Sequence, residues 1–259
     1  MIHESSFVSP KAKIGKDVVI GPFCRVHDGV EIGDGCYLDS HVVIGSQDGE
    51  VIIGKNNKFY GFSLIGGPPQ DLKYKGEKTK LVIGDSNTIR ESVTMSIGTA
   101  TGGGVTQIGN GNLIMAYSHV AHDNRIGNNN VIANTVQLAG HVTVEDKVTI
   151  GGMCAVNQFV KIGKNAFVAG GSFINKDILP FTIAQGRYAI TRATNKIGLE
   201  RSGFTEDAIK NINRAVRILT QGGGILEESV RRIDSECDKI EEINYLVSFI
   251  KSSERGIAL

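Results

Sequence analysis

Histidine and aspartate side chains meet in one short string, SHVAHDN, at residues 118–124. An imidazole titrates near neutral pH, so His122 has the chemistry of a general base that takes a proton from a reacting group. Asp123 follows directly and is suited to hold that imidazole in one tautomer. Two more histidines, His119 and His141, lie close by in the sequence. The residue types therefore indicate acid–base chemistry centred on His122.

The elements that must position these side chains follow a six-residue repeat. An aliphatic residue stands at every sixth position from Ile108 to Ile174, twelve in succession, and a second run extends from Val8 to Ile44. Helical faces recur about every 3.6 residues and strand faces about every two, so neither explains this period. Six residues form a short strand and a corner, and three such units close a triangular coil of about 18 residues. We therefore predict an all-β parallel β-helix whose coils stack about 4.8 Å apart.

Residues one coil apart should lie above one another on the same edge of such a solenoid. His122 and His141 are separated by one coil plus one residue, so we expect their side chains to lie about one strand spacing apart. Two segments break the repeat, near residues 66–82 and 96–107, and both are rich in glycine and polar residues. We expect these segments to leave the coil as loops, where binding function often lies.

The repeat ends before the last quarter of the chain, and we predict two domains. Residues 1–187 should form the β-helix and residues 188–259 a small α-helical domain. Thr205 is a suitable N-cap for a first helix, which the glycines at 222–224 should end. A second helical stretch is expected over residues 225–252, where apolar residues recur with helical spacing.

The composition disfavours several functional classes. The 28 basic and 27 acidic side chains nearly cancel, which favours neither nucleic acid nor a membrane surface as the main partner. We expect no membrane span and no signal peptide, because no long apolar run or basic leader is evident. The four cysteines have no metal-binding spacing, so we expect reduced thiols in a cytoplasmic protein.

Five strings together resemble the family of UDP-N-acetylglucosamine 3-O-acyltransferases. They are PPQDLKYKGE, IRESVTMSIGT, MAYSHVAHDN, LAGHVTVEDKVTIGGMCAVNQF and the tail segment that begins with IAQG and ends with NKIGLERSGF. The resemblance covers essentially the whole chain and implies left-handed coils and a homotrimer with active sites between neighbouring β-helices. It implies transfer of a 3-hydroxyacyl chain from acyl carrier protein to the 3-position of UDP-GlcNAc, the first step of lipid A biosynthesis. It implies no metal or separate cofactor, because the phosphopantetheine of the carrier protein brings the acyl group.

The resemblance also assigns roles to single residues. His122 matches the general base that takes the proton of the sugar hydroxyl, Asp123 its orienting partner, and Gly140 the backbone N–H donor to the oxyanion. The positions that match sugar and nucleotide contacts are Asp71, Lys73, His119, His141, Gln158, Asn195 and Arg201. The positions that match the pantetheine and acyl groove are Asn134, Gly152 and Gly170, of which Gly170 should leave room for a longer acyl chain. Because acyl carrier protein is acidic, its expected docking surface is the basic set Lys161, Lys164, Lys176, Arg187 and Arg192.

Three positions depart from the family pattern. Asn157 stands where a histidine is usual, Ser202 follows Arg201 where a second arginine is frequent, and Tyr188 stands where a histidine is frequent. These departures leave the acceptor open, and an N-acyltransferase acting on a 3-amino analogue of the UDP-sugar is the alternative.

Two further interpretations come from other functional classes. A non-catalytic hexapeptide scaffold would not need the base, yet His122 and Asp123 are both present. A zinc enzyme of the γ-carbonic anhydrase kind needs three histidine ligands. His119, His122 and His141 supply that number, but such an enzyme gives no role to the QDLKY loop or to the helical tail.

Overall fold

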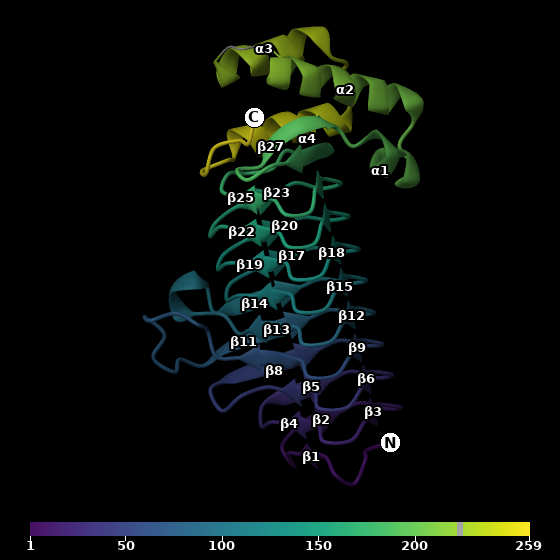
Figure 1. Ribbon diagram of the computed structural model, residues 1–259, viewed down its shortest axis with the longest axis vertical. Coiled ribbons are helices and arrows are strands. Elements are labelled where there is room, and N and C mark those ends of the chain that lie inside the picture. Colours follow the sequence, from purple (N-terminus) through teal and green to yellow (C-terminus); the bar gives the residue numbers. More distant parts are fainter. Residues whose placement is uncertain (222–224) are drawn as a thin grey trace.

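The computed structural model describes residues 1–221 and 225–259, and its strands stack into a left-handed parallel β-helix with helices on the C-terminal end (Figure 1). The predicted fold class is confirmed. The coil repeats at the predicted interval, since His119 pairs with Gln137 and Gln137 with Ala155 in parallel register. Residues 222–224, where the sequence predicts a helix end, lie outside the described residues.

Three parallel sheets form the walls of the β-helix. The first sheet contains β1 (Phe7–Val8), β4 (Arg25–Val26), β7 (Val43–Ile44), β10 (Leu64–Gly67), β13 (Thr94–Ser96), β16 (His119–Val120), β19 (Gln137–Leu138), β22 (Ala155–Val156) and β25 (Phe173–Ile174). The second contains β2 (Lys13–Ile14), β5 (Val30–Ile32), β8 (Gly49–Ile53), β11 (Thr79–Ile83), β14 (Val105–Ile108), β17 (Arg125–Ile126), β20 (Thr143–Val144) and β23 (Lys161–Ile162). The third contains β3 (Val19–Ile20), β6 (Tyr37–Leu38), β9 (Lys58–Phe59), β12 (Thr88–Ile89), β15 (Leu113–Ile114), β18 (Val131–Ile132), β21 (Thr149–Ile150), β24 (Phe167–Val168), β26 (Thr182–Gln185) and β27 (Ile190–Thr194).

Three corners join these sheets in every full coil. We call corner 1 the turn from the third sheet into the first, corner 2 the turn from the first into the second, and corner 3 the turn from the second into the third. The repeated aliphatic residues point inward and form one continuous buried core. Cys24, Cys36 and Cys154 occupy inward positions in the same core with free thiols, so packing accounts for these three cysteines.

Both irregular segments leave the β-helix at corner 2. The loops span residues 68–78 between β10 and β11 and residues 97–104 between β13 and β14. Both are shorter than the predicted ranges 66–82 and 96–107, because the flanking strands extend into those ranges. The second loop contains a short 3₁₀ turn, η1 (Ala100–Gly102), with Thr99 as its N-cap. In Figure 1 they project from one side of the solenoid near its middle. The loops therefore emerge on the edge that also carries His122.

The C-terminal region begins with a hairpin and continues as helices. β26 and β27 pair antiparallel at the end of the third sheet, and the predicted domain boundary at residue 187 falls in the turn between them. The helices are α1 (Lys196–Arg201), α2 (Glu206–Gln221), α3 (Leu226–Glu236) and α4 (Glu241–Lys251). The single helical stretch expected over residues 225–252 is thus two helices, because the Asn211 side chain binds both the N–H and the carbonyl of Asp238 in the break.

The helices pack on one another and on the last coils around a second apolar core. The chain then returns to the β-helix, where Thr191 N–H donates to the carbonyl of Ala258 over 2.8 Å. None of the helices within residues 1–221 and 225–259 has the length and apolar character needed to cross a membrane.

Candidate active site

The two corner 2 loops and the adjoining coils enclose a pocket of about 780 Å³. Its walls come from the first loop, the second loop and three successive coils. The lining residues are Gln70, Asp71, Leu72, Lys73, Thr101, Gly102, His122, His141, Gln158 and Phe159. Five predicted site residues meet here: Asp71, Lys73, His122, His141 and Gln158.

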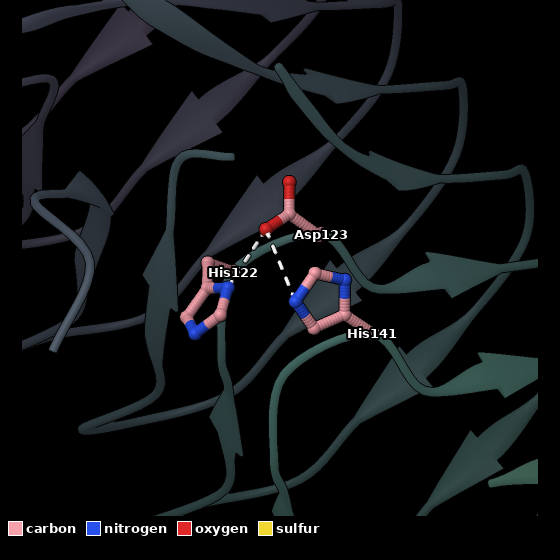
Figure 2. A group of neighbouring side chains, drawn as sticks. All are labelled: His122, Asp123 and His141. Carbon is pink, nitrogen blue, oxygen red and sulfur yellow. Dashed lines mark hydrogen bonds and ion pairs between the residues drawn. The ribbon is translucent and has the colours of Figure 1, made fainter. Parts of the chain in front are cut away.

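The pocket residue His122 forms a buried pair with Asp123. His122 Nδ1 lies 2.7 Å from Asp123 Oδ2, and Figure 2 shows this contact together with His141, whose Nε2 is 3.8 Å from the same oxygen. Only 9% of the His122 side chain and 1% of the Asp123 side chain are exposed. Because Asp123 is an acceptor, it favours the tautomer in which Nδ1 carries the proton, which leaves Nε2 as the available base.

His141 lies directly beside this pair. Its ring meets the His122 ring edge-on at 5.1 Å between centroids and stacks on Phe159 at 4.5 Å. Burial is the main cause that lowers the pKa of His141 below its ordinary value, while Asp123 and Asp71 oppose that effect. A neutral imidazole at the pocket wall can donate one hydrogen bond and accept another.

The corner backbone aims these side chains outward. Asp123, His141 and Phe159 have φ values of 59°, 63° and 65°, all in the left-handed region. Non-glycine residues such as Asp17, Phe23 and Asn56 take the same conformation at other corners, so it is a feature that the turns of the β-helix share. The six-residue repeat predicted that His122 and His141 lie on one edge. It did not reveal the left-handed backbone conformation of the corner.

Gly140 lies against the imidazole of His122. A side-chain carbon built on Gly140 would lie 2.6 Å from Cε1 and 2.8 Å from Nε2 of that ring. Within residues 1–221 and 225–259, the Gly140 N–H donates no hydrogen bond. Gly140 therefore gives the imidazole its space and leaves a free backbone donor beside it.

His119 lies outside the pocket lining. Its Nδ1 is 2.7 Å from Thr94 Oγ1 on the neighbouring strand of the first sheet. Burial, followed by the nearby His122, lowers the pKa of His119. The structure does not place His119 among the residues that line the pocket.

The ligand atoms of His122, Asp123 and His141 lie within 4.8 Å of one another, so they are the one group in the described chain that could hold a metal ion. His119 is not part of this group, so a single copy does not assemble the three-histidine set of the zinc alternative. The Asp123 carboxylate already accepts hydrogen bonds from His122 and Thr99. This arrangement suits a hydrogen-bonded base better than a metal centre.

The predicted groove residues lie at corner 1. Asn134, Gly152 and Gly170 stack in successive coils, with the Asn134 carbonyl accepting from Met153 N–H and the Gly152 carbonyl from Gly171 N–H. The first sheet separates this column from His122 at corner 2. One copy of the chain therefore does not bring the groove residues to its own base.

The predicted nucleotide contacts from the tail lie at corner 3. Asn195 is the N-cap of α1, and its amide nitrogen donates to the Asn165 carbonyl over 2.9 Å. Arg201 is exposed in the last turn of the same helix. The structure thus divides the predicted site residues among all three corners.

The three positions that depart from the family pattern have different surroundings. Ser202 ends α1 and donates to Asn165 Oδ1 over 3.0 Å, so it fastens the helix to corner 3. Tyr188 is 61% exposed and contacts Phe173 edge-on. Asn157 is half-buried directly before Gln158 of the pocket.

Two of the five basic residues expected at the docking surface have other partners. Lys161 Nζ donates to the carbonyl of Ser252, and Lys164 Nζ lies 4.0 Å from the ring centroid of Tyr245. Both contacts attach the C-terminal helices to the last coils. Lys176, Arg187 and Arg192 remain exposed.

Sequence reasoning did not assign roles to several residues at the site. Thr99 binds the Asp123 carboxylate, Phe159 stacks on His141, and Gly102 lines the pocket. The string SIGT, which ends at Thr99, was part of the family resemblance, and it was the one signal that pointed to this loop.

Comparison with known proteins gives a consistent result. Residues 177–258 match the family described as Udp N-acetylglucosamine O-acyltransferase, domain 2, and residues 11–46 and 106–140 match bacterial transferase hexapeptide repeats. The chain is 45% identical over 256 residues to the acyl-[acyl-carrier-protein]–UDP-N-acetylglucosamine O-acyltransferase of Thermodesulfovibrio yellowstonii, covering 99% of this chain and 98% of that protein. A solved UDP-N-acetylglucosamine O-acyltransferase from Moraxella catarrhalis superposes with a TM-score of 0.95 at 39% identity, covering 100% and 99% of the two chains. A UDP-N-acetylglucosamine acyltransferase from Francisella novicida superposes with a TM-score of 0.94 at 37% identity, covering 99% and 93%.

Proposed function

This chain belongs to the UDP-N-acetylglucosamine O-acyltransferase family, and we propose that His122 is its general base and that its acyl group is a 3-hydroxyacyl chain. The enzyme transfers an acyl group from acyl carrier protein to UDP-N-acetylglucosamine, the first step of lipid A biosynthesis. The observation that carries the proposed role of His122 is its buried pair with Asp123 at the wall of the corner 2 pocket.

The proposed reaction is a direct transfer. Nε2 of His122 takes the proton of the sugar 3-hydroxyl while that oxygen attacks the thioester carbonyl carbon. The tetrahedral oxyanion accepts a hydrogen bond from the free Gly140 N–H, a contribution of about 3 kcal/mol where such donors have been removed. The carbon–sulfur bond then breaks, and the proton on His122 passes to the departing thiolate of phosphopantetheine.

The remaining pocket residues supply polar contacts for the acceptor. Asp71 and Lys73 come from the first loop, while His141 and Gln158 come from the coils beside His122. Together they present an anion, a cation and two neutral hydrogen-bonding groups around the base, which suits a hydroxyl-rich sugar. We propose that these four residues hold the sugar.

A transfer assay tests the proposed function and the acceptor. The protein is incubated with 3-hydroxyacyl carrier proteins of several chain lengths and with either UDP-GlcNAc or its 3-amino analogue. We expect acylation of UDP-GlcNAc, detected as an ester product by mass spectrometry. A product only from the amino analogue would establish an amide-forming enzyme. This is the alternative that the departure from the family pattern at Asn157 leaves open. No product from either acceptor at any chain length would refute the function.

We further propose that the active site is completed in a homotrimer. His122, the groove column and Arg201 lie at three different corners of one copy, so they can meet only if corners of neighbouring copies face one another. Exposed apolar side chains also follow corner 1, including Phe23 at 60%, Phe62 at 68% and Met153 at 76% exposure. An apolar column of this kind is typical of a surface that another chain covers.

Mass and complementation measurements test the trimer. Light scattering should give three times the chain mass of 27.7 kDa. We expect His122→Ala and Arg201→Glu to be inactive alone, yet mixed subunits should recover about a quarter of wild-type activity, because some sites pair an intact His122 with an intact Arg201 of a neighbour. A monomer, or mixed subunits without recovered activity, would contradict the shared site.

The four free, buried thiols suit a reducing compartment. Together with the acyl carrier protein donor, they support the proposal that the enzyme works in the cytoplasm.

A further inference from the structure

The Asp123 carboxylate has a second partner besides His122. Thr99, in the loop of residues 97–104, donates its backbone N–H to Asp123 Oδ1 over 2.9 Å and its hydroxyl to Oδ2 over 2.6 Å. The hydrogen bond between the Thr99 hydroxyl and Asp123 Oδ2 is buried. One loop residue therefore holds both carboxylate oxygens, including the oxygen that binds His122.

The surrounding loop fixes the direction of the Thr99 hydroxyl. Its oxygen accepts from Gly102 N–H over 3.1 Å, so the hydroxyl proton remains for the carboxylate. Gly102 packs so closely that an added side-chain carbon would lie 2.0 Å from Asp123 Cγ. In β14, directly after the loop, Thr106 Oγ1 accepts from the backbone N–H of Asp123 over 2.8 Å. The loop thus holds the side chain of Asp123, and the strand that follows it holds the backbone.

These contacts fix the orientation of the base. A carboxylate with one hydrogen bond can rotate about its terminal torsion, which is broad for aspartate. Three donors on the two oxygens remove that freedom, and the oxygen facing His122 Nδ1 then has a single position. Orientation matters for the rate, because a displacement of about 1 Å in a reacting group can cost about 10²-fold.

We propose that Thr99 is a positioning residue, whose hydroxyl fixes Asp123 and thereby the orientation of His122 in the reaction. The inference rests on the proposed function of His122 as general base. Thr99 does not line the pocket, so it acts through Asp123 and has no contact with the substrate. The loop of residues 97–104 accordingly completes the catalytic pair as well as enclosing the pocket.

Two substitutions at Thr99 separate the hydroxyl from the shape of the side chain. Thr99→Val keeps the branched side chain and the backbone N–H, and it replaces the hydroxyl, with its hydrogen bonds to Asp123 and from Gly102, by a methyl group. We expect it to lower kcat about 10- to 100-fold, with KM for both substrates within about twofold of wild type. Thr99→Ser restores the hydroxyl and should recover kcat to within about threefold. The matched control is Thr191→Val, which also removes a buried hydroxyl, one that donates to the Ala258 carbonyl over 2.7 Å.

A purely structural role predicts a different result. In that case Thr99→Val and Thr191→Val would lower the melting temperature by similar amounts, and neither would change the kcat of the folded protein. If kcat of folded Thr99→Val stays within about twofold of wild type, or if Thr99→Ser falls as far as Thr99→Val, the proposal is wrong. Acyl transfer by the wild-type protein is measured in the same series, so absence of transfer would refute the proposed function instead.

A spectroscopic measurement tests the inference without substrate. Nitrogen chemical shifts of labelled histidines report the tautomer of each imidazole, and His122→Ala assigns the His122 signals. Wild type and Thr99→Ser should show His122 with its proton on Nδ1, whereas Thr99→Val should show a changed tautomer mixture. Identical His122 signals in wild type and Thr99→Val would overturn the positioning role.

Discussion

Replacing His122 with alanine is expected to lower kcat by at least about 10²-fold, because general bases contribute about 10²- to 10⁴-fold to rates. The substitution removes the imidazole that lies against Gly140, and Asp123 is held by its own partners and cannot replace it. We expect KM for the acceptor to change little, as Asp71, Lys73 and Gln158 remain to hold it.

The measurement is steady-state transfer from 3-hydroxyacyl carrier protein to UDP-GlcNAc. The matched control is His27→Ala, because His27 follows the first sheet at corner 2 in an N-terminal coil and has no place in the pocket. Thermal unfolding of both variants checks that the β-helix is intact. If folded His122→Ala retains more than about a tenth of wild-type kcat, another group must take the proton.

The repeat made the fold and half of the site predictable. The inward residues of the two unbroken runs, Val8–Ile44 and Ile108–Ile174, follow a period that stacked coils satisfy, so this part of the core followed directly from the sequence. The same period placed His122 and His141 on one edge, where the structure has them. Such a pattern conveys position along the solenoid because each coil repeats the geometry of the last.

The loop contacts could not be predicted in this way. Thr99 reaches Asp123 across a separation of 24 residues within a segment that has no periodicity. Its conformation depends on glycines and on tertiary contacts, which local patterns do not encode. Lys161 and Lys164 are a second example of tertiary contacts that the sequence did not reveal. Their positive charge suggested a docking surface, but in the structure they contact Ser252 and Tyr245 in the α4 region.

Replacing Gly140 with alanine is expected to reduce kcat nearly as much as the loss of His122, although it removes no functional group. The added methyl carbon would lie 2.6 Å from Cε1 of the His122 ring, whereas carbon atoms pack at about 3.5 to 4.0 Å. The ring is buried and held at Nδ1 by Asp123, so it can yield only by giving up that hydrogen bond. The backbone N–H proposed for the oxyanion remains in the variant.

A double-mutant cycle shows whether the methyl group acts through the imidazole. Kinetics are measured for Gly140→Ala, His122→Ala and the double variant, each with acceptor KM and thermal stability as controls. If the methyl group acts by displacing His122, it has nothing left to displace in the His122→Ala background, and the double variant should match that single variant within about twofold. Losses that multiply would instead mean that the methyl group obstructs the acyl group or the acceptor directly. The cycle therefore shows whether the absence of a side chain at Gly140 makes room for the base or for the substrate. The geometry of the corner is compatible with both.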